Sequence, residues 1–259
     1  MESFPKKRLG QHFLKDPNTA RIVVEGVTDE DVILEVGPGR GFLTTFLAER
    51  ARLVHAVELD ADVLAALRRS VSGYENVEIH TGDALRFDYA SLDPAPNKLV
   101  ANLPYNIASP LVLGLLEEAH SLRTLRFMVQ LEVARRMAAV RGSKDYAAYA
   151  VLVRLLADVR VVHKVSLQVF DPPPRVHSAV VQMERRASDL KPGEYAGVKR
   201  LVLAAFRSRR KRLVNNLPES ARGGAPRVLG TLGYGPDARA EEVSPKDFVA
   251  LYRELSWAI

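Results

Sequence analysis

The sequence of 259 residues contains no cysteine. This absence excludes disulfide bonds, thiolate zinc sites, iron–sulfur clusters and a cysteine nucleophile. Two classes of enzyme are thereby excluded: those that attack a pyrimidine carbon through a cysteine, and radical enzymes that require an iron–sulfur cluster. The six histidines show no ligand-like pairing along the chain, so we expect no metal site.

Long apolar runs are absent as well. No segment approaches the roughly 20 apolar residues of a membrane-spanning helix, and residues 1–8 lack the hydrophobic region of a secretory signal. We therefore expect a cytoplasmic protein with no membrane association, and nothing in the pattern indicates an obligate oligomer, so we expect a monomer. The net charge of +6 favours a polyanionic partner, although net charge constrains association more than function.

Short apolar runs alternate with amphipathic stretches between residues 16 and 185. The apolar runs end at glycine or polar residues, as buried strands do. The predicted strands are 32–36, 53–58, 77–80, 98–101, 125–129, 161–165 and 178–183, and the helices that alternate with them include 41–50, 110–119, 132–140 and 148–156. Because the last two strands leave no room for a helix between them, the pattern predicts an α/β fold with a doubly wound, mostly parallel sheet and an antiparallel closing hairpin.

The character of the chain changes near residue 188. Residues 185–197 are polar and contain Pro192 and two glycines, which predicts a linker. Helices without strand signals follow, at about 198–217, 226–233 and 245–256. We therefore predict a larger domain over residues 1–187 and a small all-helical domain over residues 188–259.

A glycine-rich loop is the strongest single motif. The segment 35–41, Glu-Val-Gly-Pro-Gly-Arg-Gly, directly follows a predicted strand and opens a helix. Gly37 and Gly39 let the backbone approach a ligand, and the helix amino terminus offers free N–H groups. A dinucleotide loop would need glycine where Phe42 stands. The spacing instead suits a nucleoside with an amino-acid tail and no pyrophosphate, although an ordinary tight turn is the competing interpretation.

Two carboxylates follow the next two predicted strands. Glu58 ends the second strand, where an acid can accept hydrogen bonds from both ribose hydroxyls of a nucleoside. Asp83, with Ala84 beside it, follows the third strand, where a carboxylate can accept from an adenine amino group. Each residue alone is more often a strand-end cap or a solvated charge. Together with the glycine loop they predict a ligand crevice at the carboxyl ends of the strands.

The tetrapeptide Asn102-Leu103-Pro104-Tyr105 follows the fourth predicted strand. An exocyclic adenine amine is a poor nucleophile because its lone pair is delocalised into the ring. The Asn102 side-chain oxygen and the backbone carbonyl of Leu103 or Pro104 can accept its N–H protons and favour a pyramidal nitrogen. Tyr105 can stack on the base, which must leave its own stack to enter a pocket. By itself the tetrapeptide would be a turn with a packed tyrosine; its position beyond three cofactor signals favours an adenine-amine site.

A second aromatic wall is predicted at Phe170. Three successive prolines at 172–174 build a rigid loop after it. This loop can present the Phe170 ring as the opposite stacking face for a base. A polyproline connector with a buried phenylalanine is the alternative.

The motifs, taken in order, resemble the small-subunit ribosomal RNA adenine dimethyltransferase family over nearly the whole chain. The matching segments are 10–14, 35–41, 58–60, 82–84, 102–107, 170–178, 205–217 and 239–245. The resemblance implies a Rossmann-like class I methyltransferase sheet, S-adenosylmethionine as the cofactor, and dimethylation of the N6 amino groups of two adjacent adenosines. It places these adenosines in a hairpin near the 3′ end of small-subunit rRNA, within a pre-ribosomal particle.

The resemblance also assigns residues that composition and spacing could not. It implies that His12 and Leu14 contact the cofactor alongside Gly37, Glu58, Asp83 and Asn102. The sequence departs from the family pattern at two positions. Ala147 stands where the family usually has glycine, and Arg154 where it usually has glutamine.

Two basic clusters are candidate RNA-binding segments. One holds Lys6, Lys7 and Arg8, and the other holds Arg207, Arg209, Arg210, Lys211 and Arg212. On the predicted helix, Arg209 and Arg212 would share a face. Phosphate contacts by such clusters give salt-dependent binding. For either cluster alone, a solvated charged surface is an equally good interpretation.

Two alternative functions remain open at this stage. The first is a large-subunit rRNA adenine methyltransferase, against which the segment 206–217 argues. The second is a non-catalytic RNA-binding assembly factor of the same fold, against which the intact segment 102–105 argues.

Overall fold

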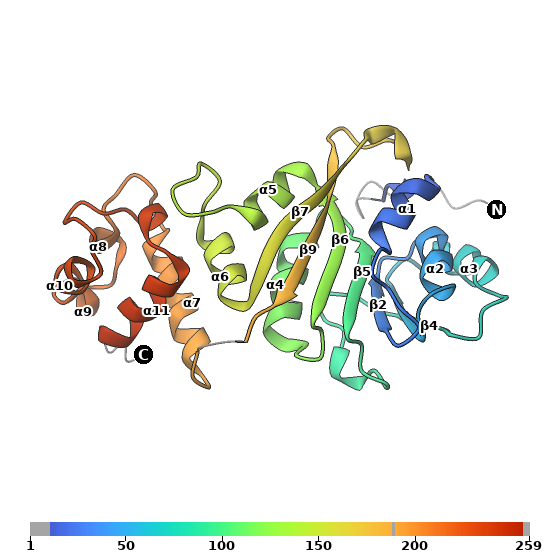
Figure 1. The fold of residues 1–259 in the computed structure, drawn as a ribbon, viewed down its shortest axis with the longest axis horizontal. Helices are drawn as coiled ribbons and strands as arrows, with labels where there is room; N and C mark the ends of the chain where they lie inside the picture. Colours follow the sequence, from blue (N-terminus) through green and yellow to red (C-terminus); the bar gives the residue numbers. More distant parts are fainter. Residues whose placement is uncertain (1–10, 188–189, 256–259) are drawn as a thin grey trace. The chain divides into compact units, whose positions relative to one another are not determined.

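The computed structural model describes residues 11–187 and 190–255 (Figure 1). Two compact units divide the chain. Among the described residues, the first contains 11–134 together with 159–185, and the second contains 135–158 together with 186–187 and 190–255. Residues 135–158, which the sequence placed in the larger domain, therefore group with the carboxyl-terminal helices. Lys6, Lys7 and Arg8 lie outside the described residues.

A seven-stranded sheet forms the centre of the first unit, in the order β4-β3-β2-β5-β6-β9-β7 (Figure 1). The strands are β2 (Val32–Val36), β3 (Leu53–Glu58), β4 (Val77–Thr81), β5 (Lys98–Asn102), β6 (Thr124–Gln130), β7 (Ala157–Val165) and β9 (Ser178–Arg185). The pairs from β4 through to β6 are parallel, and β9 joins β6 in antiparallel register. The predicted mostly parallel sheet with an antiparallel closing segment is thus confirmed.

Helices alternate with these strands as the sequence predicts. They are α1 (Pro17–Val23), α2 (Phe42–Ala48), α3 (Ala61–Ser70), α4 (Ala108–Glu118) and α5 (Leu131–Ala138). Side-chain caps fix two of their starts: Asp16 accepts from the Thr19 N–H, and Asp60 accepts from the Asp62 N–H. All five residues of β2 are buried, because helices on both sides of a parallel sheet cover both of its faces.

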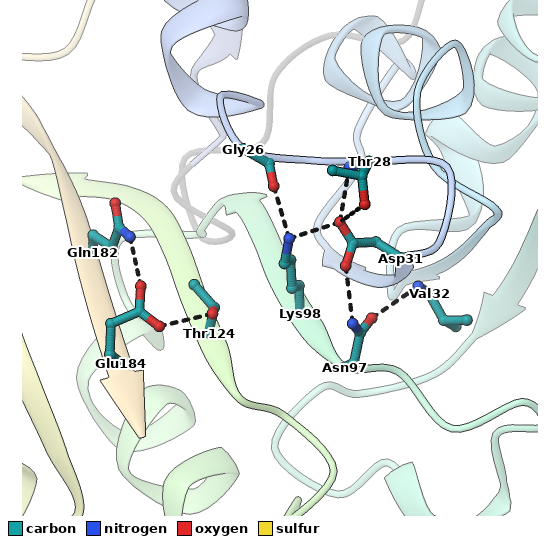
Figure 2. Close-up of polar contacts among 9 residues, drawn as sticks. All are labelled: Gly26, Thr28, Asp31, Val32, Asn97, Lys98, Thr124, Gln182 and Glu184. Atoms are coloured by element: carbon teal, nitrogen blue, oxygen red, sulfur yellow. Dashed lines mark hydrogen bonds and ion pairs between the residues drawn. The ribbon is translucent and has the colours of Figure 1, made fainter. Parts of the chain in front are cut away.

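The amino-terminal ends of β2 and β5 are joined by a polar network (Figure 2). Asp31, only 4% exposed, accepts hydrogen bonds from Thr28, Asn97 and Lys98. Lys98 Nζ also donates to the Gly26 carbonyl at 2.7 Å, and the Asn97 side chain accepts from the Val32 N–H at 2.8 Å. These contacts hold the amino-terminal ends of β2 and β5 together, at the edge of the sheet opposite the carboxyl ends of the strands.

A smaller set of contacts joins β6 to β9 (Figure 2). Glu184 accepts from the Thr124 hydroxyl at 2.9 Å and from the Gln182 amide at 2.6 Å. Cross-strand pairs of this kind stabilise an antiparallel register.

A two-stranded ribbon lies outside the main sheet. It consists of β1 (Phe13–Leu14) and β8 (Phe170–Asp171), paired antiparallel. The pairing sets Leu14 opposite Phe170 and Phe13 opposite Asp171. The segment resembling the family at residues 10–14 is therefore attached to the loop that follows β7.

The described residues of the second unit beyond 190 contain helices and loops without a strand, as predicted. The longer helices are α6 (Ala148–Leu156), α7 (Glu194–Ala205), α10 (Ala225–Thr231) and α11 (Pro245–Glu254), with short turns α8 (Leu213–Asn216), α9 (Glu219–Arg222) and a 3-10 turn at Ala240–Glu242. Arg154 of α6 donates to the Ala138 and Ala139 carbonyls. These are carbonyls that the end of α5 leaves without helical partners, which gives this departure from the family pattern a structural role.

The predicted helix over 198–217 is wrong in its second half, because α7 ends at Ala205. The Asn216 side chain donates to the Ala205 carbonyl at 2.7 Å and to the Ser208 carbonyl at 2.9 Å. It therefore satisfies backbone acceptors that a continuing helix would have used. The basic residues 207–212 lie on a loop, so Arg209 and Arg212 do not share a helix face.

Candidate active site

A cavity of about 680 Å³ opens at the carboxyl ends of the parallel strands in the first unit. Its walls come from the ribbon strand β1, the loop after β2, the ends of β3 and β4, and the segment after β5. This is the position at which doubly wound sheets bind ligands. Of the residues predicted from the sequence for cofactor binding and chemistry, the structure brings the following to the cavity wall: His12, Leu14, Gly37, Gly39, Glu58, Asp83, Ala84, Asn102, Leu103, Pro104 and Tyr105.

The glycine loop has a backbone that other residues would not adopt without strain. Gly37 and Gly39 have φ angles of +70° and +58°. A Cβ atom on Gly37 would lie 3.0 Å from Pro104 Cγ, and one on Gly39 would lie 2.9 Å from the Phe13 ring. Glycine is therefore required both for the turn and for the close approach of two other walls of the cavity.

Glu58 is buried at the end of β3 with both carboxylate oxygens oriented. Its Oε2 accepts from the Gly39 N–H at 3.0 Å, and its Oε1 accepts from the Asp60 N–H at 2.8 Å. Burial raises the pKa of Glu58 above its usual value, although these backbone hydrogen bonds act in the opposite direction. Leu59 supplies a third backbone hydrogen bond, and the remaining acceptor capacity of the carboxylate can receive a hydroxyl hydrogen bond from a ligand.

Asp83 and Ala84 lie on the loop that follows β4. Asp83 Oδ1 accepts from the Leu85 N–H at 3.0 Å, and the Tyr89 hydroxyl donates to the Ala84 carbonyl at 2.7 Å. These bonds hold the loop so that the second Asp83 oxygen is available to a ligand.

Two exposed leucines that sequence reasoning did not identify also line the cavity. Leu59 is 52% exposed and Leu85 is 47% exposed. Leu59 directly follows Glu58, and the Leu85 N–H donates to Asp83, so each presents an apolar side chain near a carboxylate. Exposed leucines with polar neighbours offer flat apolar contact for a nucleoside base, but a single leucine in a sequence carries no signal of this role.

Asn102 ends β5 with one half of its amide engaged. Its Nδ2 donates to the His12 carbonyl at 3.1 Å. Its Oδ1 is buried and has no hydrogen-bond partner among the described residues. A buried acceptor without a donor costs about 1–3 kcal/mol, so this oxygen marks the place at which a ligand N–H is expected.

Tyr105 and His12 form the adjacent aromatic wall. The Tyr105 hydroxyl lies 2.5 Å from Ser178 Oγ, and burial raises the pKa of Tyr105. The ring centroids of His12 and Tyr105 are 5.5 Å apart. His12 Nδ1 lies 2.8 Å from the Pro172 carbonyl; since a carbonyl only accepts, Nδ1 carries the hydrogen. The proline loop thereby orients His12.

Phe170 is placed differently from the prediction. The side chain is fully buried in the core that contains Leu14, Val180 and Met128. Alternate residues of a strand point to opposite sides, so the neighbouring Asp171 lines the cavity instead. In this structure Phe170 supports the ribbon and does not offer a stacking face.

Glu35, the acid before the glycine loop, is a site residue to which sequence reasoning assigned no individual role. It lines the cavity and is 1% exposed. Burial raises the pKa of its carboxyl to about 8. Near neutral pH the group is therefore largely protonated and can donate a hydrogen bond.

The carboxyl-terminal basic residues lie on the loop between α7 and α8. Arg209 pairs with Glu241 at 2.8 Å, and Arg212 pairs with Asp237 at 2.8 Å. Exposed ion pairs contribute little to stability, so both can exchange for phosphate. The side chains of Arg207, Arg210 and Lys211 are exposed.

Within the described part of the chain, no helix has both the length and the apolar character needed to cross a membrane.

Known proteins resemble this chain over most of its length. The family model for ribosomal RNA adenine dimethylase matches residues 3–256. The chain is 69% identical to ribosomal RNA small subunit methyltransferase A of Rubrobacter xylanophilus over 97% of this chain and 95% of that protein. It is 41% identical to the protein of the same name from Mycobacterium tuberculosis, over 96% of this chain and 82% of that one.

Two solved structures resemble the fold over most of the chain. A dimethyladenosine transferase from Plasmodium falciparum has a TM-score of 0.80 and 25% identity, covering 93% of this chain and 96% of that one. The 23S rRNA methyltransferase ErmE has a TM-score of 0.75 and 30% identity, covering 94% and 99%. Because the family model matches almost the whole of this chain, the chain belongs to the ribosomal RNA adenine dimethylase family.

Proposed function

We propose that this protein transfers methyl groups from S-adenosylmethionine to the N6 amino groups of adenosines in small-subunit rRNA. The observation that carries the proposal is the buried, unpartnered Oδ1 of Asn102 in the cavity wall. Membership of the ribosomal RNA adenine dimethylase family supports the chemistry. The 69% identity to a small-subunit methyltransferase supports the choice of rRNA.

The residues of the cavity fit S-adenosylmethionine. Glu58 offers two oriented acceptors for the ribose hydroxyls, and Asp83 offers one for the adenine amine. Leu59 and Leu85 provide apolar contact for the adenine ring. The glycine loop gives the amino-acid tail a close backbone approach, with His12 and Leu14 closing that side. When bound, the cofactor supplies an electrophilic methyl group on its sulfonium.

Asn102 holds the target amine in the reactive geometry. Because its Nδ2 is fixed on the His12 carbonyl, its Oδ1 accepts one amine N–H, and the carbonyl of Leu103 or Pro104 accepts the other. Accepting both protons favours a pyramidal nitrogen whose lone pair is free to attack. Pro104, packed against Gly37, fixes the turn. No general base is needed beforehand, since the amine would react in its neutral form: its nitrogen would take the methyl as the bond to the sulfonium breaks, and it would lose its proton to solvent afterwards.

Tyr105 provides the stacking surface for the extruded base. Its hydroxyl contact with Ser178 and its neighbouring His12 ring keep the phenol ring in one orientation. Stacking on an aromatic ring contributes about 1–3 kcal/mol per base, which offsets part of the cost of extruding the adenosine.

We extend the proposal to two methyl groups on each of two adjacent adenosines, in a hairpin near the 3′ end of small-subunit rRNA in a pre-ribosomal particle. In this assignment residues 1–187 bind cofactor and perform the transfer. Residues 188–259, through the basic loop 207–212, contact rRNA phosphates. The chain acts in the cytoplasm, as a monomer and without a metal in the reaction.

The likeness to a 23S rRNA methyltransferase makes large-subunit rRNA the alternative substrate. Purified protein is incubated with S-adenosylmethionine and either unmethylated small subunits or large subunits, and primer extension then locates the modified bases. We expect stops at two adjacent adenosines of small-subunit rRNA. Stops in large-subunit rRNA alone would overturn the choice of substrate, and the Asn102→Ala variant serves as the inactive control.

A further inference from the structure

Three side chains with metal-binding atoms converge on the sheet away from the active-site cavity. His55 lies on β3, and Glu78 and His80 lie on the edge strand β4. His55 pairs with Glu78 and Val57 with His80 in the parallel register, so all three side chains share one face of the sheet. None of the three lines the cavity described above.

The distances among the three atoms match a single small cation. His55 Nδ1 lies 3.1 Å from His80 Nε2 and 3.2 Å from Glu78 Oε2, and the latter two are 3.8 Å apart. The point equidistant from these atoms is about 2.0 Å from each, by the geometry of that triangle. Zinc–nitrogen and zinc–oxygen bonds are about 2.0–2.2 Å long. An ion therefore fits without moving the ligands, close to their plane.

The hydrogen bonding of His55 prepares it as a ligand. Its Nε2 lies 3.0 Å from the Pro94 carbonyl, and because a carbonyl only accepts, Nε2 carries the hydrogen. The other ring nitrogen, Nδ1, faces Glu78 and His80. A ligand histidine typically donates its other N–H to a backbone carbonyl in this way.

A cation can replace a hydrogen that the two rings share. His80 Nε2 lies within hydrogen-bond distance of His55 Nδ1, so without an ion one ring donates to the other. The Glu78 carboxylate, 3.2 Å from His55 Nδ1 and 51% exposed, is then hydrated. His55 is fully buried, which limits access of water to its ring. A positive ion placed among the three lone pairs satisfies them together.

We propose that His55, Glu78 and His80 form a site for one divalent zinc ion. The mixed imidazole and carboxylate donors suit Zn²⁺, whereas Mg²⁺ and Ca²⁺ prefer oxygen ligands. Glu78 is 51% exposed and His80 27% exposed at the side chain, so solvent can supply the fourth ligand. The site lies apart from the cavity, and its role is structural.

The ion would stabilise the loop that carries Asp83 and Ala84. This loop leaves β4 after Thr81, the residue that follows His80, and returns to His55 at Pro94. Phe87 packs edge-on against the His80 ring, with centroids 5.8 Å apart. Zinc would thus join both ends of the loop to β3.

The test uses the full chain, free of affinity tags and stripped of metal by a chelator. Isothermal calorimetry with Zn²⁺ is expected to give one ion per chain, and X-ray absorption is expected to show only nitrogen and oxygen ligands near 2.0 Å. Zn²⁺ should also raise the melting temperature, since it binds the folded state.

Glu78→Gln and His80→Gln remove one ligand each at partly exposed positions, and each should weaken zinc binding by at least tenfold. His163→Gln, at an exposed histidine of β7, is the matched control and should bind like the wild type. Absence of stoichiometric binding to the wild type, or equal binding by the wild type and both ligand variants, would overturn the proposal. If the wild type does not bind zinc, the three side chains are held together by hydrogen bonds alone. Methyl transfer is not used as a readout, so the outcome is independent of the proposed function.

Discussion

At the scale of single residues, the site depends on atoms that the fold positions but does not satisfy. The Asn102 amide is the clearest case, because its Nδ2 binds the His12 carbonyl and its buried Oδ1 has no partner among the described residues. Glu58 is similar: backbone N–H groups orient both oxygens, and the carboxylate keeps acceptor capacity for a ligand. Such groups cost stability in the free protein and contribute to binding when the ligand arrives.

Asn102→Ala should separate chemistry from cofactor binding. Removing the acceptor Oδ1 should lower the rate of methyl transfer by about 10²–10³-fold, similar to the loss of one oriented transition-state contact. Affinity for S-adenosylmethionine should change little, because Glu58, Asp83 and the glycine loop remain. Single-turnover kinetics and calorimetry measure the two effects. Near wild-type turnover in this variant would remove Asn102 from the mechanism.

Glu58→Ala should have the opposite profile. Loss of both ribose acceptors is expected to weaken S-adenosylmethionine binding by about 30–150-fold, at about 1–1.5 kcal/mol per hydrogen bond. At saturating cofactor most of the methyl transfer rate should return. Calorimetric titration gives the affinity, and an unchanged dissociation constant would contradict the assigned role.

Glu35 makes stability depend on pH. Its pKa rises from 4.5 to about 8 in the folded protein, so the folded state binds an extra proton between these values. The free energy of unfolding should therefore fall as pH rises from 4.5 towards 8. In Glu35→Gln this decrease should be smaller, as measured by urea unfolding at several pH values. Identical pH profiles for the two proteins would show that the pKa of Glu35 is not raised.

At the scale of elements, the two ends of the sheet differ in what their polar groups do. At the carboxyl ends polar atoms face the cavity, whereas at the amino ends of β2 and β5 Asp31, Asn97 and Lys98 satisfy one another (Figure 2). Burial would raise the pKa of Asp31, but hydrogen bonds from Lys98, Thr28 and Asn97 outweigh it and bring the pKa below 3.8.

Lys98→Met should lower the free energy of unfolding at neutral pH by about 3 kcal/mol, because it leaves the buried Asp31 carboxylate without its cation. In the wild type the Asp31 contribution is present above pH 3.8 and is lost as pH falls through its lower folded pKa. In the variant this loss should begin at higher pH. Denaturant unfolding from pH 3 to 7 measures both effects, with Asp31→Asn as the reference that lacks the titrating group. A variant as stable as the wild type would contradict this account.

The helices and strands could be predicted from the sequence more fully than the contacts that each side chain makes. Glu58, Asp83 and Asn102 were identifiable because each follows a strand, and parallel strands bring their carboxyl ends together. The end of α7 at Ala205 could not be predicted, because it depends on a hydrogen bond from the Asn216 amide, which lies 11 residues further along the chain.

Phe170 and His55 show the same limit at other positions. Whether Phe170 faces the cavity or the core depends on its pairing with Leu14. The histidine cluster depends on the register of β3 with β4. Neither pairing is encoded in local spacing.

At the scale of the whole molecule, the basic loop 207–212 is the candidate contact for rRNA. Arg210→Ala with Lys211→Ala should weaken rRNA binding and reduce the slope of log affinity against log salt by about 1–2. Cofactor affinity should not change. Arg68→Ala with Arg69→Ala, at exposed positions of α3, is the matched charge control. Filter binding across a salt series measures the slopes, and equal slopes in both double variants would contradict an RNA contact at this loop.

The central claim is that the Asn102 cavity dimethylates adenine amines of small-subunit rRNA. The most direct test is mass spectrometry of nucleosides from unmethylated small subunits incubated with the protein and S-adenosylmethionine. We predict N6,N6-dimethyladenosine at two residues per rRNA with the wild-type protein and almost none with Asn102→Ala. Absence of the dimethylated nucleoside with the wild type, or equal amounts with both proteins, would contradict the account.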